Sequence, residues 1–151
     1  MGTRQSWTLV AFASAGYLAL LVAGLGIASA VTDRDVISVP GTSLVAAFVA
    51  AGIGIIAFAL LLAAPLARQR PSYWSALSTA IGAGAVYLIA LGICVLVSGG
   101  DLDGTLAVLA EVSTGWVAPV FAGSALVAAW FALAVRRTAA KPPRWPWEEE
   151  T

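Results

Sequence analysis

Four long apolar segments, separated by short polar breaks, dominate the pattern of the chain. They cover residues 7–31, 42–66, 73–98 and 115–135. A hydrocarbon layer about 30 Å thick is crossed by roughly 20 apolar residues in an α-helix, and each segment reaches that length. Four transmembrane helices are therefore predicted, followed by a tail at residues 136–151.

The polar breaks contain the residue types that begin and end helices. Pro40 and Gly41 are turn residues in the first connection, and Ser72 can cap the third helix after the polar turn at residues 68–72. Because the connections are short, consecutive helices are expected to be antiparallel neighbours. The predicted fold class is an all-α integral membrane protein, a single domain built as an antiparallel bundle of four transmembrane helices.

Arginine and lysine are distributed unequally between the two ends of this bundle. One end holds Arg4, Arg68, Arg70, Arg136, Arg137, Lys141 and Arg144, and the other holds Arg34. Cytoplasmic loops of membrane proteins are enriched in these cations, so both termini are predicted to be cytoplasmic (N-in/C-in). A composition dominated by Ala, Val, Gly and Leu, with Arg in place of Lys, is typical of a GC-rich bacterial genome. The predicted location is therefore the inner (plasma) membrane.

Composition supports the membrane assignment and narrows the chemistry. Charged residues make up 11% of the chain and the mean hydropathy is +0.92, whereas a soluble domain carries about 25% charged residues. The formal net charge of zero offers no basic field for nucleic acid. With Cys94 as the only cysteine and no histidine, a zinc site, a haem ligand or a Ser-His-Asp triad cannot be assembled. No catalytic residue, metal or cofactor is therefore predicted, and the chain is not expected to be an enzyme.

Small residues recur every four positions in each span, a spacing that lets helix backbones approach one another in lipid. The stripes are Ala15, Ala19 and Ala23; Ala46, Ala50 and Gly54; Ala76, Ala80 and Gly84; and Gly115, Pro119 and Gly123. The sequence leaves open whether a stripe faces another helix of this chain or a partner. Pro119 removes one backbone hydrogen bond and is expected to kink the last span near its outer end.

Glu111 is the acidic residue with the greatest functional interest. If the last helix starts near Thr105, Glu111 lies at or just above the outer headgroups; if residues 106–114 form a separate interfacial helix, Glu111 lies on its wet face. The simple interpretation is a solvated interfacial acid. The alternative is a carboxylate that faces a cavity and couples to ion or proton movement.

Further polar residues lie in the outer loops and inside the spans. The outer acidic residues are Asp33, Asp35, Asp101 and Asp103. The segment from Asp101 to Gly104 resembles the start of a calcium loop but lacks its third acidic position and bidentate Glu, so solvated loop charges are predicted. Hydroxyl side chains within the spans, including Ser14 and Tyr17, are expected to need no function, because hydroxyls in helices can bond to the preceding turn. A row of them could instead line a pore.

The tail combines basic residues with tryptophans on a proline-rich backbone. Its basic half is expected to lie against anionic headgroups. Trp145, Pro146 and Trp147 are either a membrane-bound segment or a docking segment for a partner, because two tryptophans on a stiff extended backbone make good anchors.

Two functions from different classes remain after these exclusions. The first is a non-catalytic accessory or structural subunit of a larger membrane complex, whose partners are the lipid bilayer and other membrane subunits or further copies of itself. The second is a small homo-oligomeric transporter or channel that uses Glu111 or the outer acidic loops.

Overall fold

Every described element of the chain is an α-helix. The structure is a computed structural model that describes residues 3–33, 44–68 and 72–140, and these ranges contain no strand. Their helices are α1 (Thr3–Thr32), α2 (Leu44–Ala67), α3 (Trp74–Val97), α4 (Leu102–Thr114) and α5 (Val117–Ala140). The prediction of four helices long and apolar enough to cross a membrane is confirmed for α1, α2, α3 and α5. The 13-residue α4 lies between the last two of them.

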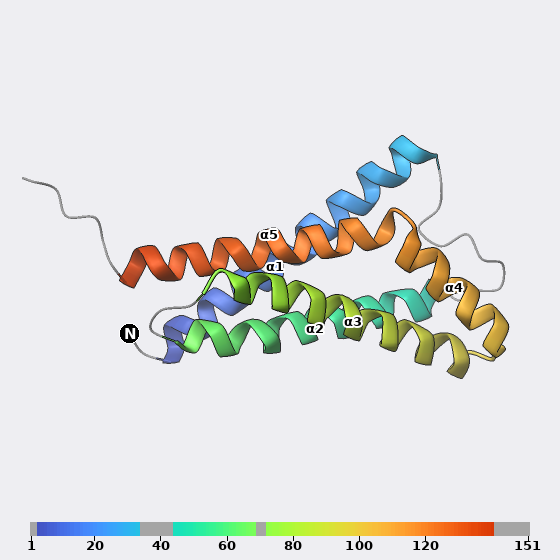
Figure 1. The fold of residues 1–151 in the computed structure, drawn as a ribbon, viewed down its shortest axis with the longest axis horizontal. Helices are drawn as coiled ribbons and strands as arrows, with labels where there is room; N and C mark the ends of the chain where they lie inside the picture. Colours follow the sequence, from blue (N-terminus) through green and yellow to red (C-terminus); the bar gives the residue numbers. More distant parts are fainter. Residues whose placement is uncertain (1–2, 34–43, 69–71, 141–151) are drawn as a thin grey trace, which may run out of the picture.

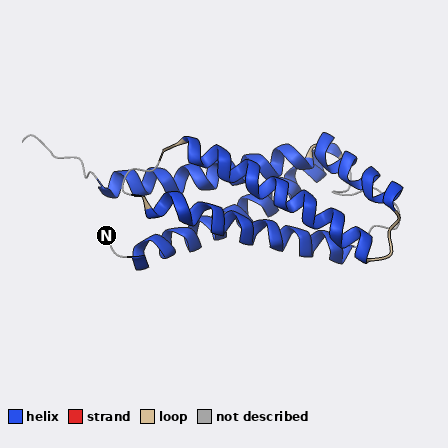
Figure 2. Cartoon of the chain, turned by 60° about the horizontal axis from the view of Figure 1, so that its bottom comes forward, coloured by secondary structure: helices blue, strands red, loops and turns tan. Residues whose placement is uncertain are grey.

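The four long helices lie lengthwise beside one another, and successive ones run in opposite directions (Figure 1). α3 packs against both α2 and α5, while α1 packs against α5 and α2. α1 crosses the others obliquely, and its C-terminal half rises away from α2 and α3 (Figure 1). The lengthwise arrangement persists when the molecule is turned (Figure 2). The start of α1 and the end of α5 lie at the same end of the structure (Figure 1).

The short helix α4 is separated from α5 by a break at Gly115 and Trp116. Gly115 has an extended backbone, with φ −82° and ψ −176°, and its N–H donates to the Glu111 carbonyl at 2.8 Å. Pro119 lies in the first turn of α5, where its missing N–H would have no partner within the helix. The expected kink at Pro119 is therefore wrong, because the chain bends at the glycine before the helix begins.

The helix α4 packs along the last turns of α3. A Cβ atom at Gly92 of α3 would lie 3.3 Å from Leu109 Cδ1, so the absence of a side chain at residue 92 allows this close approach. Gly92 is 18 residues beyond Trp74, which corresponds to about 27 Å along a helix axis. α4 therefore lies near the end of α3 that is far from Trp74.

Four aromatic rings, one from each long helix, meet in the core. The ring centroids of Tyr17 and Phe58 are 4.6 Å apart, those of Tyr87 and Phe121 are 4.1 Å apart and stacked, and Tyr17 meets Phe121 edge-on at 5.7 Å. All four side chains are buried. We call this group the central aromatic cluster. The cluster joins all four long helices at one place, because each helix contributes one ring. Each aromatic pair contributes about 0.5–1.5 kcal/mol beyond the area that it buries.

Gly54 in α2 provides room for the central aromatic cluster. A Cβ atom at this position would lie 3.1 Å from Tyr87 Cβ and 3.4 Å from the Phe121 ring. Ala46 and Ala50 on the same stripe are also buried, so the small residues of α2 face other helices of this chain. The stripe formed by Ala15, Ala19 and Ala23 on α1 is exposed.

Replacement of Gly54 by leucine is predicted to destabilise the protein through overpacking. The new side chain would displace Tyr87 and Phe121, at a cost of about 1–3 kcal/mol, and the midpoint of thermal unfolding in mild detergent should fall by several degrees. Gly52→Leu is the matched control, because no atom lies within 4 Å of a Cβ atom there. Equal midpoints for the two variants would contradict the packing described for Gly54.

Candidate functional site

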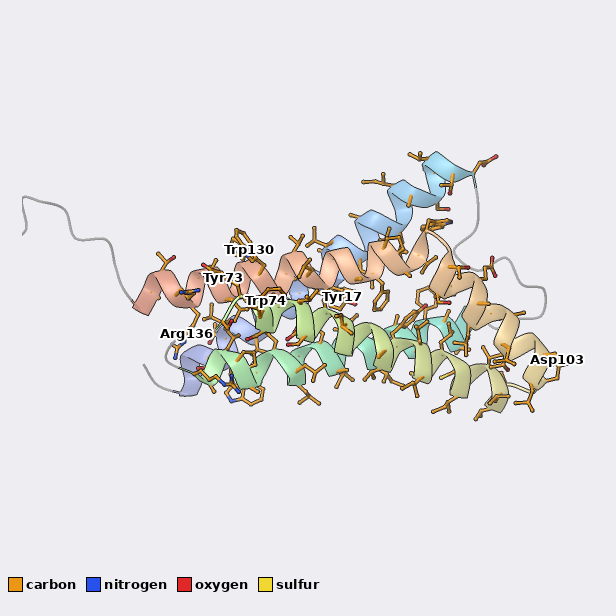
Figure 3. All side chains as sticks on the ribbon, in the orientation of Figure 1. Tyr17, Tyr73, Trp74, Asp103, Trp130 and Arg136 are labelled. Atoms are coloured by element: carbon orange, nitrogen blue, oxygen red, sulfur yellow. The ribbon has the colours of Figure 1, made fainter. Side chains whose placement is uncertain are left out.

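Polar side chains in the described residues concentrate at the two ends of the long helices. Asp101 and Asp103 stand at the start of α4, and Arg136 and Arg137 stand in the last turns of α5. Figure 3 shows Asp103 and Arg136 at opposite ends of the structure. Between these ends the core is apolar apart from a few hydroxyl groups. The candidate sites are therefore one acidic end, one basic end, and the hydroxyls of the core.

Two hydroxyl groups of α1 are buried in this apolar core. The Tyr17 hydroxyl and Ser14 Oγ have no hydrogen-bond partner among the described residues. Ser78 follows the predicted pattern and donates to the Ser75 carbonyl at 3.1 Å, but Ser14 makes no such bond. A buried hydroxyl without a partner costs about 1–3 kcal/mol. The aromatic ring of Tyr17, which packs against Phe58 and Phe121, therefore stabilises the core while its hydroxyl opposes that gain.

Glu111 lies on the separate short helix, which is the second of the two arrangements considered from the sequence. Its side chain is half-buried rather than on an exposed face. α4 contacts α3 and α5 and makes no contact with α1 or α2. Glu111 is thus kept away from the central aromatic cluster and close to the helix break at Gly115.

The outer acidic residues do not form one group in the described part of the chain. Asp33 follows α1, whereas Asp101 and Asp103 belong to α4, and α1 and α4 do not contact each other. Asp101 is the N-cap of α4, and its Oδ1 accepts a hydrogen bond from the Gly104 N–H at 2.9 Å. Capping a helix start is an ordinary role for aspartate, and it accounts for the spacing between Asp101 and Gly104. Asp35 lies outside the described residues.

No metal-binding cluster appears in the described ranges. These residues contain no group of three or more His, Cys, Asp or Glu side chains that could hold a metal ion. Cys94 is a free, partly buried thiol in α3.

The basic end contains an aromatic stack that sequence reasoning missed. The Arg137 guanidinium carbon lies 4.5 Å from the centroid of the Tyr73 ring, and Tyr73 stacks on Trp130 with centroids 6.3 Å apart. Trp130 and Arg137 are two turns apart on α5. Tyr73 immediately precedes α3 and lies near Trp130 (Figure 3). Trp130 is 53% exposed although it stacks on Tyr73. In the sequence, the seven-residue spacing of Trp130 and Arg137 places both on one side of a helix. It does not indicate that Tyr73 packs against them.

Arg136 differs sharply from its neighbour Arg137. Arg136 is 6% exposed, whereas Arg137 is exposed. The sequence assigned both to a tail that starts at residue 136, but α5 continues to Ala140. Ala139 and Ala140 favour helix and no proline occurs before Pro142, so the helix continues past the predicted end. The two arginines, which are adjacent in sequence, consequently point to different sides of α5.

The predicted docking segment follows α5 in the sequence. Trp145, Pro146 and Trp147 lie outside the described residues, so their proposed role stays a prediction.

Comparison with known proteins identifies the family. The match to a family of unknown function, DUF6121, extends over residues 1–151. The chain belongs to the DUF6121 family. No curated protein and no solved structure matches it. The family assignment therefore covers the whole chain without adding a substrate or a reaction.

Tyr17→Phe is predicted to stabilise this DUF6121 protein. The substitution keeps the ring contacts with Phe58 and Phe121 and removes the buried hydroxyl, so the free energy of unfolding should rise by about 1 kcal/mol. Tyr17→Leu is the comparison variant and should lower it, because the ring contacts are lost as well. Thermal unfolding in mild detergent measures both. A lower midpoint for Tyr17→Phe would mean that the hydroxyl makes a favourable bond.

Proposed function

We propose that the chain is a multi-pass protein of a bacterial plasma membrane, an antiparallel four-span bundle with both termini in the cytoplasm. The four long apolar helices support the number of spans. Arg68, Arg136 and Arg137 stand at the end where α1 begins and α5 ends, and cations of short loops favour the cytoplasm. The exposed residues Asp33, Asp101 and Asp103 stand at the opposite end.

Reporter fusions expressed in bacteria are predicted to report this orientation. Alkaline phosphatase is active only outside the cytoplasm, so it should be inactive when fused after Thr151 and active when inserted after Gly100, in the connection between α3 and α4. A green fluorescent protein reporter should give the reverse pattern. Active phosphatase at the C-terminus would contradict the proposed topology.

Within that membrane we propose a non-catalytic role, as an accessory subunit of a larger membrane complex. The observation that carries this proposal is the uncovered side of α1. Its buried residues Val10, Tyr17 and Leu21 form one face. Ala19 is two residues from Tyr17, about 200° around the helix, so the exposed small residues lie directly opposite the core.

This outward face of α1 has the shape that close helix packing needs. Ala15, Ala19 and Ala23 are exposed, and Gly26 has no atom within 4 Å of a Cβ position. Small side chains allow the backbone of a second helix to approach, and van der Waals contact is the main attraction between helices in lipid. The face is therefore suited to a helix of a partner subunit, with Trp145, Pro146 and Trp147 as a second docking segment in the cytoplasm.

The homo-oligomeric transporter or channel is the second candidate, and it depends on Glu111. Its half-buried position beside a helix break supports the idea, because broken helices bind ions in several transporters. The idea is weakened by the position of Glu111 on α4, which packs at the end of α3 far from Trp74 and away from the central aromatic cluster. We therefore favour the accessory role.

Purification from native membranes in mild detergent tests the accessory role. Stoichiometric, unrelated membrane subunits are expected to co-purify with the wild-type chain. Ala19→Ile should reduce their recovery several-fold by keeping the partner helix at a distance, and Ala85→Ile is the matched control on the exposed side of α3. Trp145→Ala combined with Trp147→Ala should reduce recovery further.

Two results would contradict the accessory role. A homo-oligomer without other subunits would favour the transporter or channel, and ion flux in liposomes with Glu111→Ala would then be the next measurement. Equal recovery from Ala19→Ile and Ala85→Ile would show that the outward face of α1 is not a contact surface.

A further inference from the structure

We propose that Arg137, Tyr73 and Trp130 form a binding site for an anionic phospholipid, with the lipid phosphate on Arg137. The site lies in the leaflet on the side of the chain termini. The proposal rests on the membrane insertion described above and is independent of the accessory role.

The cation–π contact prepares Arg137 for a phosphate. Its guanidinium carbon lies over the face of the Tyr73 ring, 4.5 Å from the ring centroid. The N–H donors of a guanidinium lie in its plane and point outward, where they can bind two phosphate oxygens at once. The cation–π contact thus holds the guanidinium beside the ring, and the exposed side chain can present N–H donors to a phosphate.

The aromatic part of the site extends from Arg137 toward the middle of the membrane. Trp130 is seven residues earlier on α5, about 10 Å along the helix axis. Tyr73 and Trp130 are 43% and 53% exposed despite their mutual stacking. Their open sides form an apolar surface below Arg137, where the glycerol and first acyl carbons would lie when the lipid phosphate is on Arg137.

The charges around the site favour an anion. Arg68 at the end of α2 is exposed at the same end of the structure. The described acidic residues stand at the far end of α1 or on α4 (Asp33, Asp101, Asp103 and Glu111). No described carboxylate is therefore positioned to neutralise Arg137, and a phosphate group can take that place.

The apolar surface distinguishes a lipid from a free anion. An inorganic phosphate would contact only Arg137 and would leave Tyr73 and Trp130 unused. A phospholipid covers both parts of the site at once, and a net negative headgroup such as phosphatidylglycerol avoids the ammonium group that a zwitterionic lipid would bring near Arg137. We therefore assign the site to an anionic phospholipid.

Native mass spectrometry of the full chain, released from mild detergent, tests this assignment. The probes are phosphatidylglycerol and phosphatidylcholine with identical acyl chains. The wild-type chain should retain phosphatidylglycerol preferentially, and Arg137→Gln should weaken that binding about tenfold, as expected for loss of one charge-assisted phosphate contact. Arg68→Gln removes the same charge from the neighbouring helix end and should change the binding less than twofold.

Two further variants separate the ring from its hydroxyl. Tyr73→Phe keeps the face beneath Arg137 and should bind phosphatidylglycerol like the wild type, whereas Tyr73→Leu should bind several-fold more weakly. The helical circular dichroism of each variant is compared with that of the wild type, so that a folding defect is not read as lost binding.

Three results would overturn the lipid site. Equal losses from Arg68→Gln and Arg137→Gln would mean that the general positive field attracts the lipid. Displacement of the lipid by millimolar inorganic phosphate would identify an ion site without a lipid. Equal retention of the two lipids would remove the headgroup preference. The reporter fusions test membrane orientation separately, so a failure there is distinguishable from a failure of this site.

Discussion

Contact among four aromatic rings is the interaction on which the arrangement of the long helices depends. In lipid the apolar faces of helices gain little from leaving the surrounding solvent, so association relies on shape and close contact. Each long helix contributes one ring to that contact: Tyr17, Phe58, Tyr87 and Phe121. Gly54 permits it, because any larger side chain there would meet the Tyr87 and Phe121 pair. The rest of the core consists largely of alanine, valine and leucine arranged around these rings.

The positions of the long helices could be predicted from the sequence, but the contacts between the helices could not. Uninterrupted apolar length predicts α1, α2, α3 and α5, because a polar backbone in lipid must satisfy its hydrogen bonds within the helix. The role of Gly115 was not foreseen, since proline appeared the stronger breaker, yet Pro119 falls in the one turn that tolerates it. The sequence also does not indicate which aromatic side chains of a span face the core. Phe12 and Phe48 lie in the same spans as Tyr17 and Phe58, and they are exposed.

The candidate sites were predictable to an even smaller extent. Glu111 was found because an acid near a span is conspicuous, but its half-buried setting depends on the packing of α4 against α3 and α5. The contact of Arg137 with Tyr73 joins residues 64 positions apart, and only the packed helices bring them together. Arg136 and Arg137 look equivalent in sequence, yet a rotation of about 100° between adjacent helical residues buries one and exposes the other.

The central aromatic cluster also sets an order for assembly during synthesis. Tyr17 belongs to α1 and Phe121 belongs to α5, so Phe121 is synthesised after the other three rings. α2 and α3 form an extensive antiparallel pair, and Phe58 of α2 meets Tyr17 of α1, so neither contact requires α5. The ring that joins Tyr17 to Tyr87 arrives only with α5. Without α5, Tyr87 would lose its stacked partner Phe121, while Tyr17 would keep its contact with Phe58, so the last long helix completes the cluster.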